Sequence, residues 1–195
     1  MSGHCWGEAK IIELEEELSK IKWHILGLAE VRRHGEDLEK LKSGNLFYTR
    51  GKENQSQSGV GFLIHKDIAN NVTDFNSTSD TVVMVVLKLN KRYSMKVIQV
   101  YMPTSTHPDE EIEEVYEEIE ELLDSCKTHY TMIMGDFNAT IGIQQDGENN
   151  ILGKHGVGRR NERGDGLVEF ATSRNLYIAN TKFYKKSKWT WKSIK

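Results

Sequence analysis

Two neighbouring strand-like segments, residues 81–89 and 93–101, place the strongest constraint on the fold of this chain. Both are rich in β-branched, aromatic and other apolar residues, and only the three polar residues 90–92 separate them. A connection this short joins antiparallel strands, because parallel strands need a crossover of a dozen or more residues. The sequence therefore predicts a hairpin and excludes a purely parallel sheet.

The remaining segments alternate between helix and strand patterns. Apolar residues at helical spacing predict amphipathic helices at residues 11–22 and 109–123, and a third helix is expected at about 164–174. Strands are predicted at residues 23–31, 45–50, 59–65, 130–134, 176–179 and 189–191, with 45–50 and 59–65 forming a second hairpin. With 37% hydrophobic residues among 195, the chain is long enough for a well-packed core. We predict a single domain with a mixed-sheet, layered α/β fold.

The sequence lacks the patterns of secreted and membrane-spanning proteins. No apolar stretch approaches the ~20 residues that cross a bilayer, and the first eight residues lack the basic start and apolar run of a signal peptide. The two cysteines, Cys5 and Cys126, cannot build a disulfide framework. We expect an intracellular protein, monomeric by default, that uses neither a membrane nor a small-molecule cofactor.

Charged residues are distributed unevenly along the chain. Residues 151–195 carry eleven Lys or Arg against three acids, which gives +8 and leaves −11 for residues 1–150. This basic segment also contains Trp189 and Trp191, which could stack on bases, so it fits a surface for a polyanion such as DNA. A solvated loop with an exposed tail explains the same composition, and charge alone leaves both interpretations open.

The segment Ile-Met-Gly-Asp-Phe-Asn-Ala at residues 133–139 holds the most informative candidate site residues. A buried strand leads through glycine to Asp136 and Asn138, whose side chains leave the chain on one side because they are two residues apart. An aspartate can bind a hard cation or take a proton from water, and an asparagine can donate to a phosphate oxygen. The pattern suits phosphoester hydrolysis, although a plain turn uses the same residue types.

Glu30 also follows an apolar strand, in the segment Gly-Leu-Ala-Glu-Val at residues 27–31. A single glutamate at a strand end is most often a surface residue. Magnesium, however, is held by only one or two carboxylates together with water and substrate phosphate. Glu30 and Asp136 are therefore sufficient for a Mg²⁺ site, with Mn²⁺ as the alternative metal, if the fold brings them together.

Three motifs in chain order, at residues 27–31, 100–104 and 133–139, resemble those of the endonuclease/exonuclease/phosphatase family. The resemblance covers about residues 8 to 193, nearly the whole chain. It implies a four-layer α/β/β/α sandwich and a magnesium-dependent phosphodiesterase that nicks DNA.

Further motifs resemble one subgroup of this family. The subgroup is the apurinic-endonuclease-like domain of RTE-type non-LTR retrotransposons, together with the craniofacial development protein 2-like proteins derived from it. The matching segments are residues 153–158, 160–164 and 189–191. The resemblance implies a retrotransposon-derived nuclease domain.

The family resemblance also implies roles for individual residues. Glu30 and Asp136 would be metal ligands, and Asp136 would also orient or deprotonate the attacking water. Tyr101 would hydrogen-bond near the scissile phosphate, although without the family it is simply the aromatic end of a buried strand. Asn138 would hold the phosphate. These roles agree with the needs of attack at phosphorus, which are a cation, an oriented water and phosphate donors.

Contacts to DNA are expected from four residues in or beside the subgroup motifs. They are Lys154, Arg160, Asn161 and Trp191. A protein that acts on DNA through these residues would be nuclear.

Two segments of the family have no counterpart in this sequence. Family members begin with a strand that carries an asparagine of the metal shell, and they end with a stretch that contains an Asp-His pair. This chain begins with the helix predicted at residues 11–22 and ends after residues 189–191. We therefore expect residues 8–195 to form an incomplete domain with reduced catalysis, since losing one transition-state group lowers a rate by about 10²–10³.

Three functions stay open at the level of the sequence. The first is the magnesium-dependent DNA endonuclease, and the second is a catalytically silent nucleic-acid-binding remnant. The third is a phosphatase of small phosphoesters, which the retrotransposon-like residues 153–164 disfavour.

Overall fold

The computed structural model describes residues 7–53, 58–104 and 107–184, which belong to two compact units. The first unit ends at Asp136 and the second begins at Phe137. The strand expected at residues 189–191 lies outside the described residues. The expectation of one domain over residues 8–195 stays a prediction.

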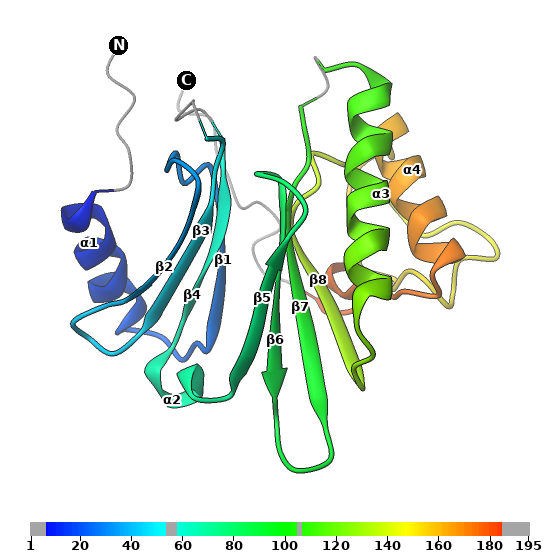
Figure 1. The fold of residues 1–195 in the computed structure, drawn as a ribbon. Coiled ribbons are helices and arrows are strands. Elements are labelled where there is room, and N and C mark those ends of the chain that lie inside the picture. The colour runs from blue at the N-terminus through cyan, green and yellow to red at the C-terminus, as the bar shows by residue number, and fades with distance from the viewer. Residues whose placement is uncertain (1–6, 54–57, 105–106, 185–195) are drawn as a thin grey trace. The chain divides into compact units, whose positions relative to one another are not determined.

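Four layers make up the first unit, in the order α/β/β/α (Figure 1). The outer layers are helix α1 (Glu8–Leu18) and helix α3 (Asp109–Ser125). The first sheet, of strand order β1-β4-β3-β2, contains β1 (Ile25–Ala29), β2 (Glu36–Lys40), β3 (Leu46–Arg50) and β4 (Val60–Ile64). The second sheet, of order β5-β6-β7-β8, contains β5 (Val72–Ser77), β6 (Val82–Lys88), β7 (Ser94–Tyr101) and β8 (Tyr130–Asp136), and the short helix α2 (Lys66–Ala69) precedes it. The predicted α/β/β/α sandwich is confirmed in this unit.

The first sheet is antiparallel throughout. The predicted second hairpin is confirmed as β3 and β4. Strand β2 was not predicted, because all five of its residues are exposed and four of them are charged. Backbone hydrogen bonds to β3 hold this edge strand. Its sequence therefore lacks the alternation of apolar and polar residues that predicts a strand.

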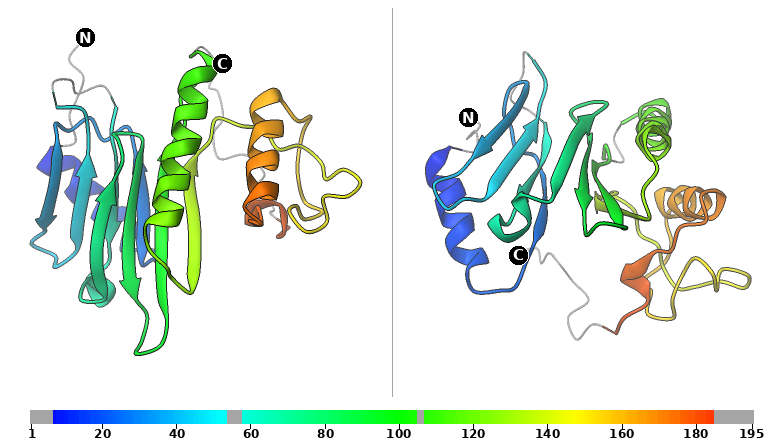
Figure 2. Two further views of the ribbon diagram at one scale, coloured as in Figure 1. Left: turned by 45° about the vertical axis from the view of Figure 1, so that its right-hand side comes forward. Right: turned by 60° about the horizontal axis from the view of Figure 1, so that its bottom comes forward.

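The second sheet is mixed. Strands β6 and β7 form the predicted hairpin, whereas β8 runs parallel to β7 after a crossover through α3. Figure 2 shows α3 lying along the outer face of this sheet. Strand β5 was not predicted, since polar residues dominate its sequence Val-Thr-Asp-Phe-Asn-Ser.

Apolar side chains fill the three spaces between the layers. The side chains between α1 and the first sheet are Ile11, Leu18, Leu28, Val31, Phe47 and Leu63. Those between the two sheets are Tyr48, Val60, Phe62, Ile64, Val83, Val85, Leu87 and Val97. Of the predicted apolar face of helix α3, Ile112, Val115, Ile119 and Leu122 are buried, and Tyr116 and Leu123 are half-buried. Helix α1 ends at Leu18, four residues before its predicted end, and Ile21 beyond it is 62% exposed.

A buried lysine fixes the end of α3 on the second sheet. Lys96 of β7 is 2% exposed, and its Nζ donates to the carbonyl oxygens of Leu122 at 3.3 Å, Leu123 at 2.5 Å and Cys126 at 2.6 Å. The last carbonyls of a helix have no partner inside the helix and attract positive charge. Lys96 therefore holds the crossover that leads from β7 to β8.

The second unit contains helix α4 (Glu162–Ser173) and the 3₁₀ turn η1 (Ala179–Thr181). The predicted third helix is confirmed and begins two residues earlier than expected. The predicted strand at residues 176–179 is wrong, because Ile178 makes only an isolated bridge to Leu152 before the chain enters η1. Leu176 and Ile178 pack instead on a small core beside α4, which explains their apolar alternation.

The helices of the described residues are short or amphipathic. None of them combines the length and the apolar character that crossing a membrane requires.

Candidate active site

Three strand ends of the first unit come together at the predicted site. Tyr101 is the last residue of β7 and Asp136 the last residue of β8, and the parallel register pairs them. Residues paired in this way point to the same face of a sheet, so the Tyr101 and Asp136 side chains are neighbours. Glu30 directly follows β1, which contacts both β7 and β8.

Glu30 and Tyr101 are joined by a hydrogen bond between the two sheets. The Tyr101 hydroxyl donates to Glu30 Oε1 at 2.9 Å. Seventy-one positions separate these residues in the sequence, so only the folded sandwich brings them together.

The pKa of Tyr101 is raised above its ordinary value. Burial of the phenol is the largest cause, followed by the hydrogen bond to Glu30 and by the negative charges of Glu30 and Asp136. A raised pKa keeps the hydroxyl protonated, so Tyr101 is a hydrogen-bond donor at neutral pH.

Arg32 is a member of the site that the sequence reasoning missed. Its Nη2 lies 3.3 Å from Glu30 Oε2, and its positive charge lowers the pKa of Tyr101 against the other influences. A basic residue two positions beyond a strand-end glutamate is the sequence signal that could have identified it. We call Glu30, Arg32, Tyr101 and Asp136 the strand-end cluster.

The backbone around Glu30 has an unusual conformation. Glu30 has a φ of 54° and Arg32 a φ of 51°, values that non-glycine residues rarely adopt and that concentrate at functional sites. Val31 between them is fully buried, and its N–H donates to the Gly59 carbonyl at 3.0 Å. The Arg32 N–H donates to the Ser58 carbonyl at 2.9 Å. These contacts hold the turn and leave the two charged side chains at the surface.

Gly135 allows β8 to follow β7 to its last residue. A Cβ at this position would lie 1.9 Å from the carbonyl oxygen of Val100, and the φ of 138° also favours glycine. Beyond this close approach, the Met102 N–H donates to the Asp136 carbonyl at 2.8 Å. The glycine of the Gly-Asp-Phe-Asn motif therefore places Asp136 beside Tyr101.

The carboxylates of Glu30 and Asp136 are the oxygen donors that the cluster offers to a cation. Across the parts of the chain that the structure describes, no three His, Cys, Asp or Glu side chains gather in a group that could hold a metal. Magnesium takes one or two carboxylates and keeps several waters. Two carboxylates are a donor set of the kind that oxygen-preferring divalent cations take, and they do not resemble the four-ligand cage of a structural zinc site.

Asn138 belongs to the second unit, two residues beyond Asp136. It is half-buried and has a φ of 48°. The expectation that Asp136 and Asn138 face one ligand spans the two units, and it stays a prediction.

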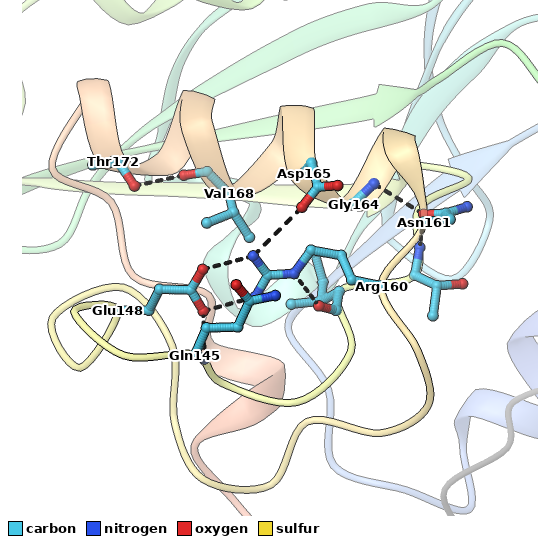
Figure 3. A network of polar contacts seen from close by, with 10 residues as sticks. Gln145, Glu148, Arg160, Asn161, Gly164, Asp165, Val168 and Thr172 are labelled. Carbon is cyan, nitrogen blue, oxygen red and sulfur yellow. Dashed lines mark hydrogen bonds and ion pairs between the residues drawn. The ribbon is translucent and has the colours of Figure 1, made fainter.

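Arg160 anchors the long loop before α4 within the second unit (Figure 3). Its guanidinium binds Glu148 through two contacts, Nη1 to Oε1 at 2.6 Å and Nη2 to Oε2 at 2.7 Å, and Nε donates to the Ile141 carbonyl at 2.7 Å. The Arg160 side chain is only 7% exposed. Its hydrogen bonds lower the pKa of the Glu148 carboxyl. We call these contacts the Arg160 network.

Asn161 caps helix α4. Its Oδ1 accepts the N–H of Gly164 at 2.9 Å and the N–H of Thr140, also at 2.9 Å. An asparagine at this position satisfies a backbone N–H that has no partner within the helix. The cap explains why the helix begins earlier than predicted.

The four expected DNA contacts therefore differ in their surroundings. Lys154 is exposed, Arg160 and Asn161 are engaged inside their own unit, and Trp191 lies outside the described residues. Their contact with DNA stays a prediction.

A family model supports the same assignment as the motifs. An endonuclease/exonuclease/phosphatase model described as endonuclease-reverse transcriptase matches residues 95–194, about half of the chain. The chain belongs to the endonuclease/exonuclease/phosphatase family. The matched segment includes Tyr101, Asp136 and Asn138, whereas Glu30 and Arg32 precede it.

Two curated relatives are similar to this chain over most of the length of the chain. Craniofacial development protein 2 of Bos taurus is 31% identical over 188 residues, which are 94% of this chain and 31% of the relative. Craniofacial development protein 2 of Tragulus javanicus is 30% identical over 188 residues, which are 94% of this chain and 32% of the relative. The chain thus spans about a third of the length of these relatives. Membership of this family supports hydrolysis of phosphoester bonds as the class of reaction.

Proposed function

We propose that this chain is a magnesium-dependent phosphodiesterase domain that nicks DNA, of the kind found in retrotransposon endonucleases. The observation that carries the proposal is the strand-end cluster, in which Tyr101 is bonded to Glu30 and paired with Asp136. Two carboxylates beside a protonated phenol could together bind a metal ion and a phosphate diester. Mn²⁺ is the alternative metal, and a DNA substrate implies a nuclear protein.

Glu30 and Asp136 would hold the metal. A divalent cation bound there would neutralise charge on the phosphate and favour ionisation of water. The donor set fits this use because two carboxylates leave room for water and for substrate oxygens.

The remaining residues of the cluster supply hydrogen bonds and charge. Tyr101 donates from a hydroxyl that stays protonated at neutral pH, so it can hold Glu30 in place or contact a phosphate oxygen. Asp136 would orient the attacking water or take its proton. Arg32 adds positive charge beside Glu30, where negative charge develops on the phosphate. Asn138 would hold a phosphate oxygen through its amide.

Binding of DNA would use the basic segment that follows residue 150. Lys154 is exposed there, and Trp191 would stack on a base or sugar. Arg160 and Asn161 support this surface through the loop and the helix that they fix. Contacts between lysine or arginine and phosphates make binding sensitive to salt.

A plasmid-nicking assay tests the proposal. The chain should convert supercoiled plasmid to the nicked form with Mg²⁺ or Mn²⁺, and the variant Asp136→Ala should lose this activity. Asp74→Ala, an exposed aspartate of β5, is the matched control and should nick like the unmodified chain. Equal nicking by Asp136→Ala would contradict the proposal.

Two other outcomes would replace the proposal. Salt-sensitive DNA binding with no cleavage at any metal concentration would identify a catalytically silent remnant. Hydrolysis of small phosphate esters without nicking would identify a phosphatase of the same family.

A further inference from the structure

The turn between β5 and β6 connects both sides of the strand-end cluster. The carbonyl of Thr81 accepts the Tyr101 N–H at 2.9 Å. The preceding residue, Asp80, accepts a hydrogen bond from the Ser58 hydroxyl. The carbonyl of Ser58 in turn accepts the Arg32 N–H at 2.9 Å. One serine–aspartate bond thus joins Ser58, the backbone partner of Arg32, to Asp80, the residue directly before the backbone partner of Tyr101.

The same turn is fixed to helix α3. Glu118 accepts hydrogen bonds from the Ser79 hydroxyl at 2.6 Å and from the Thr81 hydroxyl at 3.2 Å. Burial raises the pKa of this carboxyl. The turn is therefore fixed to the outer helical layer, while Asp80 reaches Ser58 in the segment before β4.

We infer that Ser58 and Asp80 are positioning residues, which set the spacing between the Glu30–Arg32 side and the Tyr101–Asp136 side of the strand-end cluster. We call their bond the Ser58–Asp80 clasp. The inference rests on the proposed function, because it gives the spacing of the cluster a catalytic use.

The physical reason lies in how the two sheets are held. Between them the contacts are mostly apolar, and apolar attraction has no preferred direction. A hydrogen bond to a carboxylate is directional and stronger than a neutral one. The clasp therefore supplies a fixed direction at the edge where Glu30 of one sheet must meet Tyr101 of the other. A displacement of about 1 Å in such a site can lower a rate by about 10²-fold.

The test compares variants that break the clasp with variants that keep it. Ser58→Ala and Asp80→Ala remove one partner each, whereas Ser58→Thr keeps the hydroxyl and Asp80→Asn keeps an acceptor oxygen. Asp74→Ala on β5 is the control for loss of an aspartate from the second sheet. Thermal unfolding of each variant checks that the domain is folded at the assay temperature.

Two measurements are made on each variant. The alanine variants should lower kcat for plasmid nicking by about 10- to 100-fold with KM within about twofold, and the conservative variants should restore most of the rate. Hydrogen exchange of the Arg32 and Tyr101 amides should accelerate by about tenfold or more in the alanine variants, while exchange at Val85 in the middle of β6 stays the same.

Unchanged exchange at both amides would overturn the clasp, and so would an unchanged kcat in both alanine variants. The double variant should be no slower than the slower single variant, because both substitutions remove the same bond. An unmodified chain without nicking activity would contradict the proposed function, and the exchange rates alone would then decide whether the clasp positions the cluster.

Discussion

The strand-end cluster of the first unit and the Arg160 network of the second unit both pair an arginine with a glutamate, but the pairs differ in construction. Arg32 meets Glu30 through a contact of 3.3 Å, and the two side chains are 40% and 50% exposed. Arg160 meets Glu148 through contacts of 2.6 and 2.7 Å, and these side chains are 7% and 17% exposed.

This difference separates a structural ion pair from one that is suited to a ligand. The Arg160 fork is filled by Glu148 and by the Ile141 carbonyl, so its planar donors are used within the unit. The Arg32 pair is open to solvent, both of its residues have positive φ, and Glu30 is shared with Tyr101. Residue type and motif position alone do not distinguish the two, whereas burial and the number of contacts do.

The largest expected effect concerns Glu30. Replacing it with glutamine removes a carboxylate from the metal site and should lower plasmid nicking by about 10²–10³-fold. Thermal stability should change little, because the side chain is half exposed. The rate is measured on supercoiled plasmid, with Glu17→Gln on α1 as the matched control. An unchanged nicking rate in Glu30→Gln would show that the strand-end cluster is not the catalytic site.

The Arg160 network should respond in the opposite way. Arg160→Ala leaves Glu148 without its partner and is expected to destabilise the second unit by about 3 kcal/mol. Urea unfolding measures this loss, and Arg159→Ala, an exposed neighbour, should stay within about 0.5 kcal/mol of the unmodified chain. Equal stability of the two variants would show that the buried pair does not hold the loop.

Arg32 should matter for rate and not for stability. Arg32→Ala is expected to slow nicking by about tenfold, which is less than the loss of an enclosed donor. An exposed ion pair contributes at most about 1 kcal/mol, so the unfolding midpoint should barely move. Arg92→Ala in the loop between β6 and β7 is the control for removing an arginine. A large fall in stability with no change in rate would reverse the contrast between the two arginines.

The smallest expected effect is at Asn161. Asn161→Ala removes the cap of α4 and should lower the stability of the second unit by about 1 kcal/mol. Asn161→Ser keeps a capping oxygen and should restore most of that loss. Urea unfolding distinguishes the variants, and DNA binding weakened equally in Asn161→Ser and Asn161→Ala, despite the restored stability of Asn161→Ser, would assign the residue to the nucleic-acid surface instead.

Much of the fold follows from local patterns. The pattern of apolar residues within each segment predicts the hairpin of β6 and β7 and the hairpin of β3 and β4. The same holds for the amphipathic helix α3. Strand β2 lacks such a pattern, since its residues are exposed and mostly charged, and it is held to β3 by backbone pairing and by the contacts of Glu36 with Tyr48 and Arg50. Leu176 and Ile178 show the opposite case, because a small core produces strand-like alternation without a sheet.

The residues of the candidate site could likewise be predicted from the sequence only in part. Glu30 and Asp136 were recognised as acids that follow apolar strands, and Tyr101 through the family motif. Their convergence depends on the parallel pairing of β7 with β8 and on the contact between the sheets, which no local pattern encodes. Arg32 carries only a weak sequence signal, a basic residue two positions beyond Glu30, and its contact with the Glu30 carboxylate is visible only in the structure.

The most direct test of the metal site is a Mn²⁺ titration of the ¹⁵N-labelled chain, in which the paramagnetic ion broadens the amide signals nearest to it. The amides of Glu30, Tyr101 and Asp136 should lose intensity first, and Glu30→Gln should remove this selectivity. Helix α3 provides the competing surface, because its exposed face is strongly acidic. Broadening that begins on α3, or that is the same in Glu30→Gln, would contradict a metal site at the strand-end cluster.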